Sequence, residues 1–203
     1  MATLTNGKLA GKKVTQKIFP KLHKGVLAAV NAIVVHQTGA PSAQHTFNSY
    51  SNANANGAHF LIDKNGDIYQ TALITQKTYH VGKLQSRCLQ VKACSPEELT
   101  VATNILYAKG QSFAARVRNL HKHEQAKPYP DRYPSNNDSI GIEIVGEFSK
   151  PANAYAQVNA KQNASLKWLV SELESLLSLT SDDIYRHPEA SRKHATEAST
   201  AQW

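Results

Sequence analysis

The segment 139–148, SIGIEIVGEF, restricts the possible folds more than any other part of the sequence. Ile140, Ile142 and Ile144 alternate with small or polar residues, a period of two that predicts a β-strand with two different faces. Glu143 belongs to the face opposite the isoleucines. Because burying an unpaired carboxylate is unfavourable, we expect Glu143 to face a cleft or a matching partner.

Two further strand signals precede this segment. Four consecutive apolar residues at 32–35, mostly β-branched, predict a short buried strand with His36 at its end. The runs HFLI and DIYQ flank Asn65 and Gly66, a dipeptide that supplies the turn of a β-hairpin.

Helices are predicted between and after these strands. The region 96–120 has helical composition, and Ser95 fits an N-cap with Pro96 at the first helical position. The run NASLKWLVSELESLLSL is amphipathic, since its apolar residues recur at spacings of three and four: Leu166, Leu169, Val170, Leu173, Leu176 and Leu177. This order of elements predicts a single α/β or α+β domain, with a central mixed β-sheet flanked by helices.

The charge of the chain favours an anionic partner. Lysine and arginine total 23 against 15 acidic residues, a formal charge of +8 that suits nucleic acid, anionic lipid or an acidic cell-wall polymer. No nucleic-acid-binding signature accompanies the charge, and no stretch reaches the roughly 18 apolar residues of a membrane span. We therefore expect neither nucleic-acid binding nor membrane insertion. The N-terminal stretch has no secretory signal, so we expect synthesis in the cytoplasm and delivery to any external target by another route.

Cys88 and Cys94 are the only cysteines, with five residues between them. They are too few for a zinc knuckle. The sequence is equally compatible with a short-loop disulfide and with two free thiols.

Metal-binding side chains occur at widely separated positions. His36 ends a predicted strand, His187 follows another short apolar run, and Glu197 comes ten residues later. A catalytic zinc site needs three protein ligands of imidazole, thiolate or carboxylate type, and a mixed sheet can bring two strand ends together. His194 competes with Glu197, because a helix beginning at Pro188 would place His194 near the face of His187. Spacing alone leaves these alternatives open.

Five segments, in this order, resemble the zinc-dependent N-acetylmuramoyl-L-alanine amidases: AIVVHQTGA, GAHFLIDKNGDIYQT, TYHVGK, SIGIEIVGEF and the His187 segment. That family includes phage amidases, peptidoglycan-recycling enzymes and peptidoglycan recognition proteins. The resemblance implies one amidase domain over 1–203, with its core at about 30–200 and an N-terminal extension at 1–29. It also implies a zinc ion and hydrolysis of the amide between N-acetylmuramic acid and the L-alanine of the peptidoglycan stem.

The resemblance assigns roles to individual residues. His36 and His187 match the two zinc histidines, and Glu143 matches the glutamate that activates the attacking water. Three residues are implied as substrate contacts: Gln37, Tyr79 and His80. Polar side chains of QHTFNSYSNANAN are expected to shape one wall of the substrate groove.

The chain departs from the family at the third zinc ligand. The family has Cys or Asp there, and a lysine two residues earlier helps to stabilise the oxyanion. The matching position holds Glu197, which we predict as the ligand, with His194 as the alternative. Ala195 occupies the lysine position, so Lys193 or His194 would have to replace the lysine, and we predict Lys193 as the catalytic cation.

These observations support two hypotheses of different classes. The first is a zinc-dependent peptidoglycan amidase, and the second is a non-catalytic peptidoglycan-binding module of the same fold, which the departure at position 197 keeps open. The pattern resembles amidases associated with type VI secretion. It therefore predicts an antibacterial effector or lysin that is exported or injected to act in the periplasm or cell wall. Such an effector would be paired with a cognate immunity protein and with secretion machinery.

Overall fold

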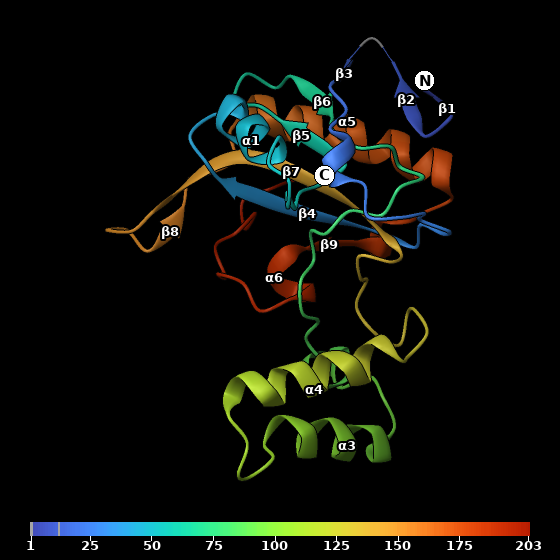
Figure 1. Ribbon diagram of the computed structural model, residues 1–203, viewed down its shortest axis with the longest axis vertical. Helices are drawn as coiled ribbons and strands as arrows, with labels where there is room; N and C mark the ends of the chain where they lie inside the picture. Colours follow the sequence, from blue (N-terminus) through green and yellow to red (C-terminus); the bar gives the residue numbers. More distant parts are fainter. Residues whose placement is uncertain (1, 12) are drawn as a thin grey trace.

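The computed structural model describes residues 2–11 and 13–203, and a mixed β-sheet of seven strands forms its centre (Figure 1). The strands are β3 (Val14–Gln16), β4 (Ala32–Gly39), β5 (Phe60–Ile62), β6 (Ile68–Gln70), β7 (Ser139–Ser149), β8 (Ala154–Tyr155) and β9 (Ile184–Arg186). Their order is β3-β6-β5-β7-β4-β9, and β8 pairs with β7. The pairs β5-β6 and β7-β8 are antiparallel, whereas the other pairs of this sheet are parallel. The predicted mixed sheet and the hairpin around Asn65 are confirmed.

Six α-helices in the described residues accompany the sheet: α1 (Ala43–Tyr50), α2 (Arg87–Val91), α3 (Pro96–Leu106), α4 (Phe113–Gln125), α5 (Ala160–Leu177) and α6 (His187–Ala190). The helix α5 covers one face, where its leucines share a buried cluster with Ile140, Ile142 and Ile144. Figure 1 shows α3 and α4 together on the opposite side of the sheet, beyond α6. The fold is therefore an α/β domain with a sheet flanked by helices, as predicted.

The register of the two central strands places the chemistry-bearing residues. In the parallel pair β4-β7, His36 lies beside Glu143 and Val35 beside Ile142. Since side chains alternate along a strand, His36 and Glu143 point away from the face that α5 covers. The apolar alternation read from the sequence thus fixes which face carries polar groups.

The N-terminal region packs against this domain. Its short hairpin consists of β1 (Thr3–Thr5) and β2 (Lys8–Ala10), and β3 extends the sheet by pairing with β6. Leu9 of β2 is fully buried in the same cluster as the leucines of α5. The described part of the segment 1–29 therefore contributes to the core and to one sheet edge.

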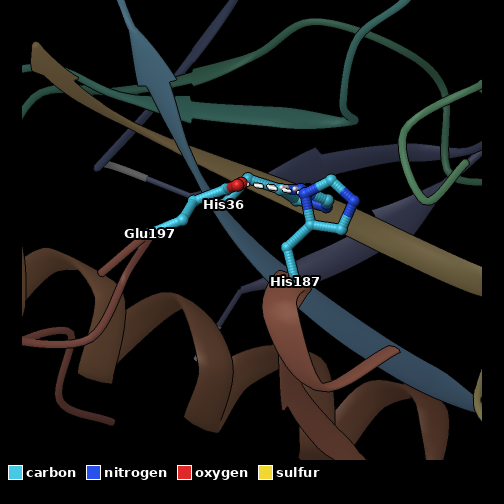
Figure 2. A group of neighbouring side chains, drawn as sticks. All are labelled: His36, His187 and Glu197. Atoms are coloured by element: carbon cyan, nitrogen blue, oxygen red, sulfur yellow. Dashed lines mark hydrogen bonds and ion pairs between the residues drawn. The ribbon is translucent and has the colours of Figure 1, made fainter. Parts of the chain in front are cut away.

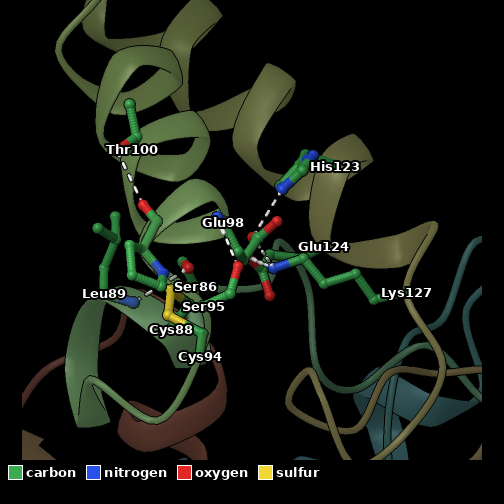
Figure 3. Close-up of a disulfide and its surroundings, with 11 residues drawn as sticks. Ser86, Cys88, Leu89, Cys94, Ser95, Glu98, Thr100, His123, Glu124 and Lys127 are labelled. Carbon is green, nitrogen blue, oxygen red and sulfur yellow. Dashed lines mark hydrogen bonds and ion pairs between the residues drawn. A yellow bond between two sulfur atoms is a disulfide. The ribbon is translucent and has the colours of Figure 1, made fainter.

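The region predicted as helical at 96–120 forms two helices. Ser95 and Ser112 cap α3 and α4 by accepting hydrogen bonds from backbone N–H groups in the first turns. The helix α3 ends at Leu106, and Gly110, with a φ of 74°, lies in the loop that leads to α4. Cys88 in α2 is joined by a disulfide to Cys94, just before α3 (Figure 3).

A charged cluster joins α3 to α4 beside this disulfide (Figure 3). Lys127 Nζ lies 2.6 Å from Glu124 Oε1 and 2.5 Å from Glu98 Oε1, and His123 Nε2 lies 2.8 Å from the same Glu98 oxygen. Glu124 is fully buried. The lysine therefore neutralises the buried carboxylate of Glu124, which would otherwise have no cationic partner. None of the helices in the described ranges is long and apolar enough to cross a membrane.

Candidate metal centre and active site

Three metal-binding side chains meet on the polar face of the sheet (Figure 2). His187 Nδ1 lies 2.8 Å from Glu197 Oε1, and His36 Nδ1 lies 3.7 Å from the same oxygen. One donor atom from each residue falls within 4.8 Å of the others, and all three side chains are buried. Two imidazoles and one carboxylate match the donor set of catalytic zinc sites.

Strand pairing brings the two histidines together. The strands β4 and β9 are adjacent and parallel, with Val35 beside Arg186, so the next residue of each chain segment is a histidine. The strand β9 ends there, and α6 begins at His187 with Pro188 in its first turn. The pairing of β4 with β9 thus brings together two histidines that are 151 positions apart in the sequence.

The helix α6 ends at Ala190, so it does not extend to His194. His194 instead pairs with Thr196 through Nδ1, and its ring packs against Phe148 at a centroid distance of 5.0 Å. His194 lines the pocket, but Glu197 is the residue that joins the two histidines.

Glu197 sits in a C-terminal loop that several hydrogen bonds hold in place. Arg186 donates from Nη2 to the carbonyl of Ala201 and from Nε to the carbonyl of Ala198. Gln37 Oε1 accepts from the N–H of Ala198, and Gln37 Nε2 donates to the carbonyl of Ala156. Gln37 lines the pocket, yet both polar atoms of its amide are bonded to backbone. Its substrate contact stays a prediction.

Hydrogen bonds fix the tautomers of the histidines. His80 Nε2 lies 3.3 Å from the carbonyl of Ser139, which can only accept, so neutral His80 donates there and its Nδ1 accepts from His36 Nε2 at 3.0 Å. His187 Nε2 likewise donates to the carbonyl of Val81 at 2.8 Å. Neutral His36 and His187 therefore keep their Nδ1 lone pairs for a cation. A backbone carbonyl, such as the one that accepts from His187, commonly orients a metal-bound histidine.

The contact between His187 and Glu197 indicates that a cation can bind there, because the proton of neutral His187 is on Nε2 and its Nδ1 faces Glu197. A lone pair on Nδ1 and a carboxylate oxygen 2.8 Å apart repel each other unless a proton or a metal ion lies between them. The residues present therefore fit a bound divalent cation.

Two carboxylates in this pocket have opposite pKa shifts. Burial opposes ionisation of Glu197, but its close contacts with His187 and His36 outweigh burial and lower its pKa to about 2. Burial, reinforced by the charge of Glu197, raises the pKa of Glu143 to about 8 despite the opposing charge of Lys193. Glu143 Oε2 is buried and has no hydrogen-bond partner among the described residues. One carboxylate is thus held ionised and the other is available for proton transfer.

His36 and His80 are held neutral by their surroundings. Burial lowers the pKa of His36 to about 3, with a further contribution from His187, although Glu197 opposes the shift. Burial and the neighbouring histidines lower the pKa of His80 well below its ordinary value. His80 packs tightly on β7, because a Cβ at Gly141 would lie 2.8 Å from His80 Nδ1. Neutral imidazole is the form that binds metals.

The site opens into a pocket of about 290 Å³. Its lining includes the predicted residues Tyr79, His80, Glu143 and Lys193, and Asn56 from the segment expected to shape one wall. Tyr155 also lines the pocket; burial and the charges of Glu197 and Glu143 raise its pKa to about 12. Sequence reasoning missed Tyr155, because it lies on the two-residue strand β8, which leaves no periodic signal.

A second group of potential ligands lies in the helical region: Glu98, His123 and Glu124. Their carboxylates already pair with Lys127, as described above. The ammonium group of Lys127 therefore already occupies the place that a cation would take in this group.

Comparisons with known proteins agree with this geometry. A sequence model of the family described as N-acetylmuramoyl-L-alanine amidase matches residues 27–200. A comparison with curated proteins gave no match.

Three solved structures illustrate the similarity in fold. A selenomethionine derivative of AmpD has a TM-score of 0.54 and 16% identity, covering 96% of this chain and 90% of that chain. The catalytic domain of XlyA has a TM-score of 0.51 and 20% identity, with coverages of 89% and 87%. A mutant endolysin from Bacillus subtilis has a TM-score of 0.50 and 18% identity, with coverages of 86% and 82%. Since the family model covers most of the sequence, the chain belongs to the N-acetylmuramoyl-L-alanine amidase family, which acts on peptidoglycan.

Proposed function

We propose that the protein is a zinc-dependent amidase that cleaves the bond between N-acetylmuramic acid and L-alanine in peptidoglycan. His36, His187 and Glu197 are the proposed zinc ligands. The observation that carries the proposal is the convergence of one ligand atom from each of these three residues within 4.8 Å of one another, in the pocket that Glu143 also lines. A zinc ion bound there supplies Lewis-acid polarisation of the amide carbonyl and makes water more acidic.

Glu143 is the proposed general base and acid. It takes a proton from the attacking water as the new C–O bond forms, and then gives a proton to the amine nitrogen as the C–N bond breaks. The pKa of about 8 belongs to the protein without bound metal. Positive charge in the pocket favours the carboxylate form, so Glu143 can accept a proton at neutral pH when the site is loaded.

The remaining pocket residues have supporting roles in this proposal. Lys193 is exposed at the pocket and supplies a positive charge for the developing oxyanion. Tyr79, which is 47% exposed, is placed to contact substrate. His80 bonds to His36, so we assign it mainly to positioning that ligand, and Gln37 to supporting the loop of Glu197.

The test of the proposal is amine release from purified sacculi by zinc-loaded protein. We expect new N-terminal L-alanine and no new reducing sugar ends. Glu143→Ala should lower the rate by about 10²–10⁴-fold, the usual contribution of a general acid-base residue, while retaining zinc. Glu147→Ala is the matched control, because Glu147 lies on the same strand but is exposed. Intact stem linkages, or an unchanged rate in Glu143→Ala, would contradict the assignment.

We further propose that the enzyme is an antibacterial effector or lysin acting in the periplasm or cell wall, paired with an immunity protein when delivered by a secretion system. The disulfide supports an oxidising compartment, and the +8 charge suits an anionic sacculus. Expression in a Gram-negative host tests this: the protein should lyse cells only when a leader directs it to the periplasm. Equal toxicity from the cytoplasm would argue against the assignment.

A further inference from the structure

We infer that a second cavity beside the active site binds the anionic stem peptide of the substrate, an inference that rests on the proposed function. This cavity, here called the Phe113 pocket, has a volume of about 380 Å³. Its lining is Gly82, Lys83, Phe113, Ala114, Val117, Ser191, Arg192 and Lys193.

The Phe113 pocket adjoins the catalytic pocket. Lys193 lines both cavities, and Arg192 and Lys193 belong to the loop between His187 and Glu197. This wall is anchored, because Ser191 Oγ donates to the carbonyl of Lys83 at 2.9 Å. A chain with one end beside Glu143 can therefore continue past Lys193 into the Phe113 pocket.

The chemistry of this pocket is apolar and cationic. Phe113, at the first position of α4, is 57% exposed, and the guanidinium of Arg192 lies 5.3 Å from its ring centroid. Lys83 and Lys193 add two ammonium groups, and no acidic residue is among the described residues that line the pocket. An aromatic surface flanked by cations suits a peptide that carries free carboxylates, since guanidinium binds carboxylate through paired hydrogen bonds.

The other side of the catalytic pocket has a different character. A neighbouring cavity of about 270 Å³ shares Thr38, Asn56 and Glu143 with it and is also lined by Thr46 and Ser49 of α1. Hydroxyl and amide groups of this kind suit uncharged sugar hydroxyls. The two flanks therefore give the substrate a direction, with the glycan toward α1 and the stem peptide toward α4.

Calorimetric titration with the released stem peptide tests the inference independently of hydrolysis. The probe is a tetrapeptide that begins with L-alanine, compared with the same peptide whose carboxylates are amidated. Wild type should bind the free acid about tenfold more tightly, the range expected for one charge-assisted contact. Arg192→Ala should lose most of that preference, and Phe113→Ala should weaken binding of both peptides.

Arg118→Ala is the matched control, because Arg118 is exposed on the same helix as Phe113 and outside this pocket. Arg192 is also exposed, so unchanged melting temperatures should confirm folding. Equal affinities of wild type for the two peptides, or an undiminished preference in Arg192→Ala, would overturn the inference. Hydrolysis of sacculi by the same preparations reports separately on the proposed function.

Discussion

Glu143 and Glu197 line the same pocket, but their surroundings shift their pKa values in opposite directions. The contacts of Glu197 with His187 and His36 keep its pKa low, whereas the Oε2 atom of Glu143 has no partner in the described structure and its pKa is raised. An ionised carboxylate can hold a cation, while one near neutrality can exchange protons. This difference in function follows from the contacts of each side chain, since both residues are glutamates.

Ionisation of Glu143 should destabilise the metal-free protein as pH rises. Its folded pKa of about 8 exceeds its ordinary value of 4.5, so the native state binds an extra proton between these pH values. The stability that the neutral form confers is complete below about pH 4.5 and is lost as pH rises through about 8. Glu143→Gln should therefore melt above wild type by a margin that grows from pH 5 to pH 8, measured with a chelator. A constant margin would contradict the raised pKa.

Glu197 and His194 should differ in their effect on zinc retention. Glu197 Oε1 is close to both histidines, whereas His194 bonds to Thr196 and packs on Phe148. We expect one zinc per chain in wild type and His194→Ala and substoichiometric zinc in Glu197→Ala, measured by elemental analysis after dialysis. Retention by Glu197→Ala with loss in His194→Ala would reverse the assignment.

At the scale of secondary structure elements, the helical region depends on one buried ionic cluster between α3 and α4. Lys127 is the cation that pairs with the fully buried Glu124. Lys127→Met should destabilise the protein by about 3–5 kcal/mol, because it leaves a buried charge uncompensated. Urea denaturation measures this change. Lys122→Met, an exposed change in the last turn of α4, should stay within about 0.5 kcal/mol.

A second substitution separates loss of charge pairing from loss of packing. Glu124→Gln in the Lys127→Met background removes the unpaired charge and should recover part of the stability. No recovery would mean that Lys127 acts through its packing alone.

The sequence predicted the elements whose periodicity is strong. The alternating isoleucines identified β7 and the outward face of Glu143, and the leucine spacing identified α5. The short strands β3 and β8 left no such pattern, because two or three residues cannot establish a period. These two strands form because their backbone groups pair with β6 and β7, and the sequence does not show that these segments come together.

The candidate site residues could also be predicted only where the sequence around them has a clear pattern. The ends of β4 and β9 were inferable from short apolar runs, so the sequence indicated His36 and His187 as possible ligands at adjacent strand ends. The choice between Glu197 and His194 depended on the length of α6, which no residue in the sequence fixes by itself. The proposed peptide pocket left no sequence signal, because Phe113 and Arg192 come together only when α4 packs near the C-terminal loop.

For the whole molecule, the net charge of +8 should make binding to sacculi salt-dependent. Surface charges separated by more than a Debye length of about 8 Å are largely screened at physiological ionic strength. We expect the fraction of protein that co-sediments with sacculi to fall steeply between about 50 and about 500 mM salt, because the Debye length shortens across this range. The melting temperature should change little over this range. Salt-independent binding would indicate that the excess charge has no part in substrate association.

The proposed function depends on one zinc ion held by His36, His187 and Glu197 beside Glu143. X-ray diffraction from zinc-loaded crystals at wavelengths on either side of the zinc absorption edge locates this ion. We expect one strong anomalous peak per chain, bonded to the Nδ1 atoms of both histidines and to the carboxylate of Glu197. A peak at another set of side chains, or no peak at this group in fully active protein, would contradict it.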